Sequence, residues 1–343
     1  MKERHANIAV FVPHNGCPNQ CSFCNQRTIS GAAQQPTPAD VAAALQEHAA
    51  RLEGGAVWDR GELAFFGGSF TAIERDYMCS LLEAAQPFLR AGVIDGIRCS
   101  TRPDCIDSEV LACLKGYGVT AIELGAQSMD DRVLALNRRG HTAQQVREAS
   151  GLIKAEGFEL GLQMMTGLYG DSNEGAINTA TEIAALQPDT VRIYPTVVLR
   201  ETELAQLYQA GVYTPQTTDE AAELCATLLP IFAERGIRVI RVGLHAEENV
   251  ERNYVAGAYH PALRELCESR IFLRRMTGLA GQYTAVDYRV NPRDVSKALG
   301  QRRCNIDMLK KQGIEGRIIQ DAAVPQGEII AEERIEARQK QSN

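Results

Sequence analysis

Short apolar runs alternate along this chain with longer segments in which apolar residues recur every three or four positions. The short runs are typical of buried β-strands, and the longer segments are typical of amphipathic helices that cover a sheet. One helix start is well marked, because Thr37 is a favoured N-cap and Pro38 suits the first helical position. The first part of the chain predicts six strands, at residues 7–12, 63–66, 96–100, 120–124, 158–165 and 190–198.

Helical patterns lie between these predicted strands, so the connections are too long for hairpins. Strands joined by helical crossovers form a parallel sheet with right-handed connections. Six strand–helix units predict an α/β fold, a partial (β/α)6 TIM-like barrel rather than a full barrel of eight units. Ligands of such folds bind at the carboxyl ends of the strands, and we expect the reactive groups there.

The second part of the chain has a different pattern. It predicts a long helix at about residues 217–235, a strand at 238–242 and another helix at about 261–279. Further strands are expected at residues 283–290, 316–320 and 328–331. This pattern predicts a small α/β C-terminal extension. We therefore expect a barrel core at residues 1–200, the extension at 201–330 and a polar tail at 331–343, with no linker rich in Gly, Pro or Ser between core and extension.

Composition narrows the class of protein. Apolar residues make up 45% of the 343 residues and charged residues 23%, which are the values of an ordinary globular protein and exclude disorder. The net charge of −7 disfavours a global electrostatic attraction to nucleic acid or anionic lipid. No apolar run approaches the roughly 18 residues of a membrane span, and the stretch Ile8–Val12 is too short for a signal peptide. We expect a cytoplasmic protein with no membrane association.

Ten cysteines are many for a chain expected in a reducing compartment. Seven are scattered singly and are interpreted as small buried apolar residues. The other three, Cys17, Cys21 and Cys24, crowd into one loop after the first predicted strand. Three thiolates on a short loop can converge on one soft metal centre. Tetrahedral zinc normally has a fourth protein ligand, and no second pair of Cys or His at motif spacing is evident. A [4Fe–4S] cluster can be held by three cysteines, with the fourth iron open to a non-protein ligand. A structural metal site and a Cys21/Cys24 redox pair are the alternatives.

Polar or glycine residues follow three other predicted strands. Gly67 and Gly68 end the second strand, where they let the backbone approach a ligand closely or simply form a tight turn. Arg102 follows the third strand and is a candidate for binding a carboxylate or substrate anion, with a structural ion pair to Asp104 as the alternative. Glu123 and Gln127, at the end of the fourth strand, could hydrogen-bond the hydroxyl groups of a ribose.

The Cys-x3-Cys-x2-Cys spacing of the cysteine loop resembles that of the radical S-adenosylmethionine (radical SAM) enzymes. The resemblance implies a [4Fe–4S] cluster on Cys17, Cys21 and Cys24, with S-adenosyl-L-methionine (SAM) as the second cofactor. It also implies that Phe23 packs near the adenine, and that the stretch Gly67-Gly68-Ser69 contacts the methionyl amino group. Ser69 stands where the family often has a glutamate, so backbone carbonyls are expected to do more of that binding.

A series of later motifs is similar, in the same order, to the radical SAM part of the Elongator catalytic-subunit (Elp3) family, which modifies the tRNA wobble uridine. The motifs are Glu123–Gln127, Arg138–Thr142, Met164–Gly170, Arg192–Thr196 and Gly257–Pro261. The similarity covers about residues 7–290, and oxygen-independent coproporphyrinogen oxidases are similar more distantly. Two departures limit what it implies. That family continues into an acetyltransferase-like domain, for which 343 residues leave no room, and it carries a basic N-terminal segment that we do not find.

We therefore expect an enzyme that cleaves SAM reductively and uses the 5′-deoxyadenosyl radical to abstract hydrogen from a substrate in the barrel. The implied electron donor is of the flavodoxin or ferredoxin type. Further candidates for the pocket are His14, Arg192, Tyr194 and His245. The alternative, from another class, is a zinc- or cluster-binding regulatory protein without turnover.

The substrate stays open between a tRNA base and a small molecule, because the net charge of −7 argues against a nucleic acid. Basic doublets could still form a local patch, although each one alone is more often a solvated surface. The doublets are Arg138-Arg139, Arg274-Arg275, Arg302-Arg303 and Lys310-Lys311.

Overall fold

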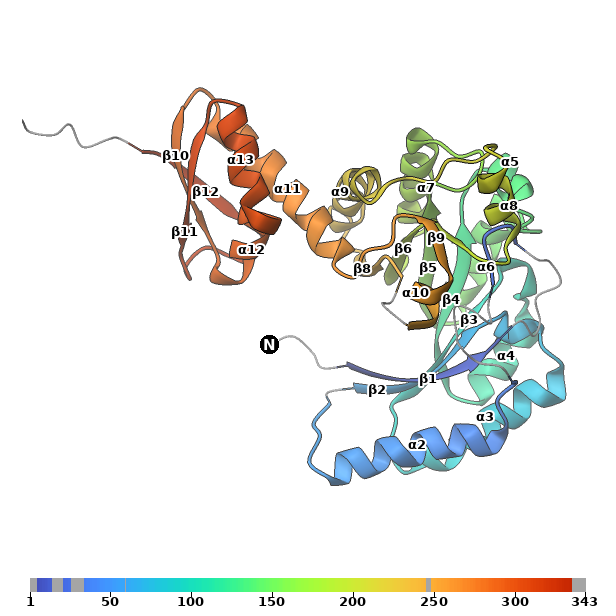
Figure 1. The fold of residues 1–343 in the computed structure, drawn as a ribbon. Helices are drawn as coiled ribbons and strands as arrows, with labels where there is room; N and C mark the ends of the chain where they lie inside the picture. The colour runs from blue at the N-terminus through green and yellow to red at the C-terminus, as the bar shows by residue number, and fades with distance from the viewer. Residues whose placement is uncertain (1–4, 14–20, 26–33, 59, 245–247, 335–343) are drawn as a thin grey trace, which may run out of the picture. The chain divides into compact units, whose positions relative to one another are not determined.

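The structure is a computed structural model that describes residues 5–13, 21–25, 34–58, 60–244 and 248–334. The chain divides into two compact units, shown in Figure 1. The barrel unit comprises Met1–Thr217 and Leu228–Tyr259, and the extension unit comprises Thr218–Thr227 and His260–Asn343. No helix within the described ranges is both long enough and apolar enough to cross a membrane.

The barrel unit is built on one parallel seven-stranded sheet in the order β1-β2-β3-β4-β5-β6-β8. Its strands are β1 (His5–Val12), β2 (Arg60–Gly67), β3 (Gly96–Thr101), β4 (Val119–Gln127), β5 (Glu159–Thr166), β6 (Thr190–Pro195) and β8 (Arg238–Val242). The predicted α/β partial barrel is confirmed. The strand expected at residues 238–242 as part of the extension is the seventh strand of this sheet.

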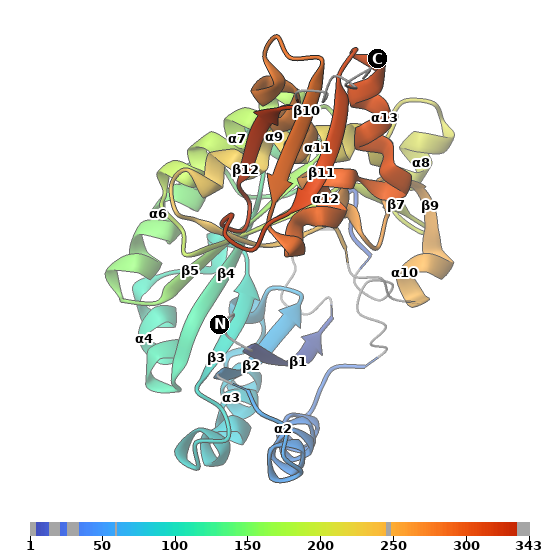
Figure 2. The ribbon, with the colours of Figure 1, turned by 90° about the vertical axis from the view of Figure 1, so that its left-hand side faces the viewer.

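Helices that follow the strands cover the convex side of the curved sheet (Figure 2), namely α2 (Pro38–Glu53), α3 (Arg75–Arg90), α4 (Ser108–Gly116), α6 (Ala143–Ala155) and α7 (Asn173–Ala185). The short helix α8 (Glu203–Gln209) packs on β7 instead. The remaining helices are α5 (Asp131–Leu136), α9 (Thr218–Ala233), which is divided between the two units, and α10 (Glu248–Asn253). The predicted N-cap at Thr37 is confirmed, since its hydroxyl accepts the Asp40 N–H while the Asp40 carboxylate accepts the Thr37 N–H. Thr142 caps α6 in the same way through Gln145.

The strand predicted at residues 190–198 is divided in two. After Pro195 the chain leaves the sheet, and β7 (Val197–Leu199) pairs antiparallel with β9 (Tyr254–Gly257). Gly257 makes this close pairing possible: its φ is +104°, and a Cβ there would lie 2.7 Å from the Thr196 carbonyl oxygen. The small β7–β9 sheet stands beyond the carboxyl end of β6.

The extension unit packs helices on one face of a three-stranded sheet. Its elements are α11 (Leu263–Ala280), β10 (Ala285–Val290), α12 (Val295–Leu299), α13 (Cys304–Lys311), β11 (Glu315–Gln320) and β12 (Ile329–Glu333). The sheet order is β11-β10-β12, with β10 parallel to β11 and antiparallel to β12. Alternate residues of β10, including Tyr288, are buried against Met276 of α11 and Leu309 of α13.

Candidate functional site

The cysteine loop begins at the carboxyl end of β1, at the edge of the barrel where ligands were expected. It is described from Cys21 to Asn25, so Cys17 and His14 lie outside the described residues, as does His245. The Cys24 N–H donates to the Cys21 carbonyl oxygen at 3.0 Å, which makes a tight turn between the two thiols. Among the described residues, which leave out Cys17, no group of three Cys, His, Asp or Glu is placed to hold a metal ion.

Ser22 fixes this turn to the rest of the barrel unit. Its N–H and its hydroxyl both donate to Asn137, to the carbonyl oxygen at 3.1 Å and to the side-chain oxygen at 2.8 Å. Its carbonyl oxygen accepts the Leu204 N–H at 2.8 Å. The ring of Phe23 packs on two apolar clusters, one around Val198 and the other around Met165. The position of the loop is therefore set by residues that lie more than a hundred positions further along the chain.

Arg139 connects the cysteine loop to the end of β4. Its Nη1 donates to Cys21 Sγ at 3.4 Å, and its Nη2 donates to the Gly125 carbonyl oxygen at 2.8 Å. The side chain is 9% exposed, and its Nε has no partner among the described residues. A Cβ at Gly125 would lie 2.6 Å from Arg139 Nη2 and 2.8 Å from Gln127 Nε2, so this glycine makes room for both side chains. Gln127 itself has a φ of +64° beside a bulge in β4.

Two more buried side chains lie near Arg139. Arg102 is 2% exposed and forms a bidentate pair with Asp104 at 2.8 and 2.9 Å, which leaves its Nη1 without a partner among the described residues. His141 Nε2 lies 3.1 Å from the Ala126 carbonyl oxygen, and its buried Nδ1 is likewise unpartnered. Burial, together with the charge of Arg139, lowers the pKa of His141 to about 4. A neutral His141 that donates through Nε2 presents Nδ1 as an acceptor.

These three unpartnered nitrogens define the chemistry of the site. A buried polar group without a hydrogen bond costs about 1–3 kcal/mol, so such a group calls for an explanation. Two guanidinium donors suit a carboxylate or a thiolate, and one imidazole acceptor suits an ammonium group. An amino-acid zwitterion beside a cysteine thiolate would satisfy all three. The residues present therefore fit the SAM and the cysteine-bound cluster that the sequence resemblance implies.

Gly67, Gly68 and Ser69 lie at the end of β2, next to the start of the cysteine loop. Gly67 has a φ of +110°, and a Cβ there would lie 3.0 Å from the Val12 carbonyl oxygen. The Gly68 N–H donates to that same oxygen at 2.8 Å. Ser69 is buried, and its hydroxyl contacts Thr101 Oγ1 at 2.8 Å and accepts the Arg102 N–H at 3.2 Å. The serine thus ties the ends of β2 and β3 together.

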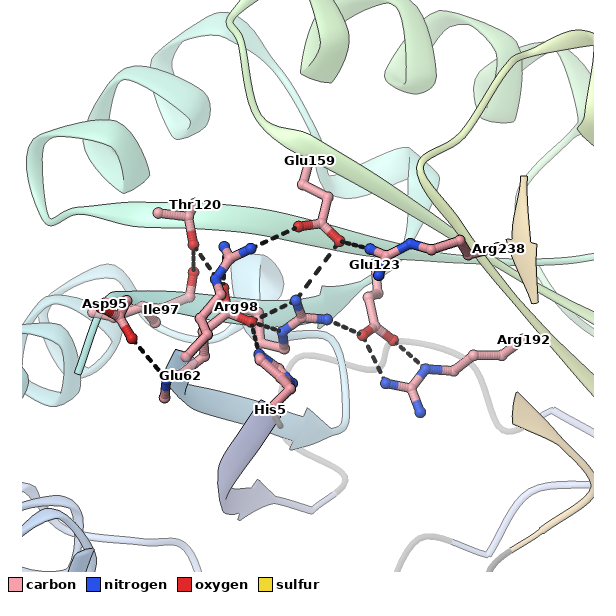
Figure 3. A network of polar contacts seen from close by, with 12 residues as sticks. His5, Glu62, Asp95, Ile97, Arg98, Thr120, Glu123, Glu159, Arg192 and Arg238 are labelled. Carbon is pink, nitrogen blue, oxygen red and sulfur yellow. Dashed lines mark hydrogen bonds and ion pairs between the residues drawn. The ribbon is translucent and has the colours of Figure 1, made fainter. Parts of the chain in front are cut away.

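Glu123 lies deeper in the barrel than Gln127, and Figure 3 shows its surroundings. Its carboxylate accepts hydrogen bonds from Arg192 at 2.7 and 2.8 Å, from Arg98 at 3.1 Å and from Gln163 at 3.0 Å. Burial favours the neutral acid, but the charges of Arg192 and Arg98 prevail and lower the pKa of Glu123. Both oxygens of the Glu123 carboxylate are therefore hydrogen-bonded by other side chains of the protein. The side-chain amide of Gln127, on the same strand, makes no hydrogen bond within the described part of the chain.

The network of Figure 3 continues from Glu123 on β4 to β1, a strand at the edge of the sheet. Arg98 also pairs with Glu62 at 2.6 Å, and Glu62 lies 2.7 Å from His5 Nε2 on β1. Arg192 lies over the Phe66 ring at 5.5 Å, and its neighbour Tyr194 packs in the cluster around Met165 that also contacts Phe23. The network thus joins strands β1 to β6 below the carboxyl-end site.

Sequence reasoning did not place Asn137, Arg139 or His141 at this site, and it considered Arg139 only as part of a basic doublet. The polar run from Asn137 to His141 between two helices was a usable signal. The scattered cysteines are free thiols, and Cys99, Cys225 and Cys267 are buried as predicted. Cys79, Cys105 and Cys113 are only half-buried, so the prediction is met in part there. Cys304 is exposed, which corrects the prediction for that residue, because α13 turns Asn305 and Leu309 toward the core instead.

Comparisons with known proteins bear on this site. Residues 11–183 match the family described as the Radical SAM superfamily, and residues 188–272 match the Radical_SAM C-terminal domain. The chain is 28% identical over 255 residues to the tRNA uridine(34) acetyltransferase of Dehalococcoides mccartyi, covering 64% of this chain and 55% of that protein. It is 30% identical over 234 residues to human Elongator complex protein 3, covering 62% of this chain and 42% of that protein.

The solved structure of the archaeal Elp3 from Methanocaldococcus infernus has a similar fold, with a TM-score of 0.62 at 23% identity. The match covers 81% of this chain and 64% of that one. The chain spans about half the length of the curated relatives that it matches. The matched family model covers half of the chain and includes the cysteine loop, the glycine turn and the ends of β3 and β4. The protein is therefore an enzyme of the radical SAM superfamily, homologous to the radical SAM region of the Elongator subunit.

Proposed function

We propose that this protein binds a [4Fe–4S] cluster through Cys17, Cys21 and Cys24 and cleaves SAM reductively. When bound, the cluster supplies one electron, which splits SAM into methionine and a 5′-deoxyadenosyl radical that takes a hydrogen atom from the substrate. The observation that carries the proposal is the contact of Arg139 with Cys21 Sγ beside three unpartnered buried nitrogens. Membership of the radical SAM superfamily supports it.

The remaining roles belong to this chain's own side chains. Arg139 stabilises the Cys21 thiolate by a charge-assisted hydrogen bond, and its free Nε is directed to the methionyl carboxylate together with Arg102. The methionyl end of the SAM site is bordered by Gly67, Gly68 and Ser69. Gln127 offers its amide to the ribose, and Phe23 offers its ring to the adenine. Glu123 we assign to positioning, because Arg192 and Arg98 already occupy its oxygens.

Anaerobic reconstitution tests this proposal. The wild-type protein should turn brown, bind about four iron atoms and release 5′-deoxyadenosine from SAM when a strong reductant or a reduced flavodoxin is added. A variant with Cys17, Cys21 and Cys24 replaced by alanine should lose both iron and product. The matched control replaces Cys79, Cys113 and Cys304, three thiols outside the loop, and should keep both. Equal product from the loop variant, or a colourless zinc protein, would contradict the proposal.

We propose a tRNA base as the substrate. The support is the identity to two proteins whose names state an action on tRNA uridine or a place in Elongator. Transfer of deuterium into 5′-deoxyadenosine from tRNA deuterated in its bases, after incubation with enzyme, SAM and reductant, would support this choice. 5′-Deoxyadenosine without deuterium, in a preparation that does cleave SAM, would exclude tRNA while leaving the SAM chemistry intact.

A further inference from the structure

A four-residue loop in the extension unit joins two short helices between two parallel strands. The order is β10, α12, Gly300–Arg303, α13 and β11, and β10 pairs with β11 directly. Figure 2 shows α12 and α13 beside these strands. Most of this unit lies beyond residue 272, where the family matches end.

The loop has an unusual backbone. Gly300, Arg302 and Arg303 have φ values of +72°, +51° and +66°, so two consecutive arginines adopt the left-handed region that favours glycine. Non-glycine residues rarely adopt this region, and such conformations persist where the surrounding structure imposes them. A Cβ at Gly300 would lie 2.6 Å from Cys304 Sγ, so the loop also needs its glycine.

Asn305 holds this backbone in place. Its side-chain amide is buried, and Nδ2 donates to the carbonyl oxygens of Ser269, Lys297 and Ala298 at 3.0 to 3.1 Å. Its Oδ1 accepts the Ser269 hydroxyl at 3.3 Å. The loop is therefore fixed to α11 and α12, and the two arginines are presented from a rigid base.

The structure also separates the four basic doublets of the sequence. Arg139 is buried at the cofactor site and Arg138 pairs with Glu203, while Arg274 of the second doublet pairs with Glu223. The four side chains of the other two doublets are exposed and have no ion pair or hydrogen bond among the described residues. They are Arg302, Arg303, Lys310 and Lys311.

Arg302-Arg303 directly precedes α13 and Lys310-Lys311 forms its last two residues, while Asn305 and Leu309 form its inner side. The extension unit is also less acidic than the chain as a whole. Residues 260–343 carry 15 Lys and Arg against 11 Asp and Glu, and residues 218–227 of the same unit add three acidic residues, whereas the whole chain has a net charge of −7. Unpaired cations on a rigid support match a polyanion, because they lose no protein partner when they bind phosphate.

We propose that the Gly300–Arg303 loop and α13 form a binding surface for the backbone of single-stranded RNA. The spacing resembles the Gly-x-x-Gly loop with which KH modules clamp about four nucleotides, with Arg303, at a φ of +66°, in the position of the second glycine. The choice of RNA as the polyanion rests on the proposed tRNA substrate. The surface itself does not depend on SAM cleavage.

The test is binding of a fluorescein-labelled, mixed-sequence 12-nucleotide RNA by the full chain, followed by fluorescence polarisation. The variant is Arg302→Asn with Arg303→Gly, which removes both charges but introduces residues that accept positive φ readily. Misfolding therefore does not explain a loss of binding, and an unchanged melting temperature checks this. The matched control is Arg132→Gln with Arg147→Gln, two exposed, ion-paired arginines of the barrel unit.

We expect the variant to bind the RNA at least tenfold more weakly, and its slope of log K against log salt to fall by about 1.4. The control should bind like the wild type. Four results would each overturn the proposal. The wild type does not bind the RNA, the variant binds it as tightly as the wild type, the control loses as much affinity as the variant, or the wild type binds a duplex of the same length as tightly as the single strand. SAM cleavage without substrate should be unchanged in the variant. If SAM cleavage fails in every protein while RNA binding behaves as expected, the proposed chemistry is wrong and this surface stands.

Discussion

At the scale of single residues, two arginines next to each other in the sequence have unrelated roles. Arg139 is buried between Cys21 and the Gly125 carbonyl, while Arg138 is exposed and pairs with Glu203. A surface ion pair contributes at most about 1 kcal/mol, whereas a charge-assisted hydrogen bond to a buried group contributes about 1.5–3 kcal/mol. Substituting each of these two neighbouring arginines in turn therefore compares the loss of a buried contact with the loss of a surface ion pair.

The Arg139→Gln variant should bind SAM more weakly after anaerobic reconstitution. The loss of one charge-assisted contact predicts an increase in Kd of roughly 10- to 100-fold. Equilibrium binding of SAM to the reconstituted protein measures this, with iron content determined in the same sample. Arg138→Gln is the control and should leave Kd within about twofold. Equal affinities for the two variants would remove Arg139 from the proposed site.

Glu62 gives a second prediction, about pH. Its side chain is fully buried, and burial favours the neutral acid, but the His5 contact and the charges of Arg98 and Arg60 prevail and lower its pKa to about 2. Since the ordinary pKa is about 4.5, the unfolded chain takes up this proton at a higher pH than the folded one. The stabilisation by ionised Glu62, roughly 3 kcal/mol, is complete above pH 4.5 and is lost as the pH falls toward 2.

Urea unfolding of the wild type and of Glu62→Gln should show this pH dependence. The difference in free energy of unfolding should be largest near pH 7 and should shrink as the pH falls from about 4.5 to about 2. Glu182→Gln, which removes an exposed partner of Arg147, should cost less than about 1 kcal/mol. A difference between wild type and Glu62→Gln that stays constant over this range would refute the proposed ionisation.

At the scale of elements, β1 and β2 approach each other closely where they end, and Gly67 there has a positive φ that favours glycine. β1 and β2 pair in register up to Val12 and Gly67, directly before the cysteine loop. The Gly68 N–H donates to the Val12 carbonyl oxygen, the same atom that a side chain at Gly67 would crowd at 3.0 Å. This junction therefore sets where the loop leaves the sheet.

The Gly67→Ala variant should destabilise the protein and lower its iron content together, because both the positive φ of +110° and the Val12 backbone oppose a Cβ. We expect a loss of more than about 2 kcal/mol in the free energy of unfolding. Gly92→Ala is the matched control: its φ is +67° but nothing lies within 4 Å of the added Cβ, so only the backbone cost of about 1 kcal/mol applies. Full iron incorporation by Gly67→Ala would show that this junction does not position the loop.

At the scale of the whole molecule, the features that could be predicted from the sequence are those that depend on the local pattern of apolar, polar and turn-forming residues. The strands of the large sheet, the N-cap at Thr37 and the parallel arrangement follow from short-range signals. The contact of Arg139 with Cys21 joins residues 118 positions apart, and no local pattern encodes it. Glu123 was expected to face a ligand, but its partners come from three other strands whose registers only the folded sheet defines.

Net charge is likewise a property of the whole chain that hides local differences. The value of −7 argues against RNA, yet four cations around α13 lack acidic partners in the described part of the chain.

If these four make the phosphate contacts, the slope of log K against log salt for an unmodified tRNA should be about −3, because each contact to a single strand contributes about 0.7. Titrations between low and physiological salt measure this slope. Lys310→Gln with Lys311→Gln should reduce it by about 1.4, whereas Arg51→Gln with Lys115→Gln, which changes the net charge equally but removes cations paired in the barrel unit, should not. A slope near zero in the wild type would mean that the acidic balance of the whole chain, and not the local surface, decides its partners.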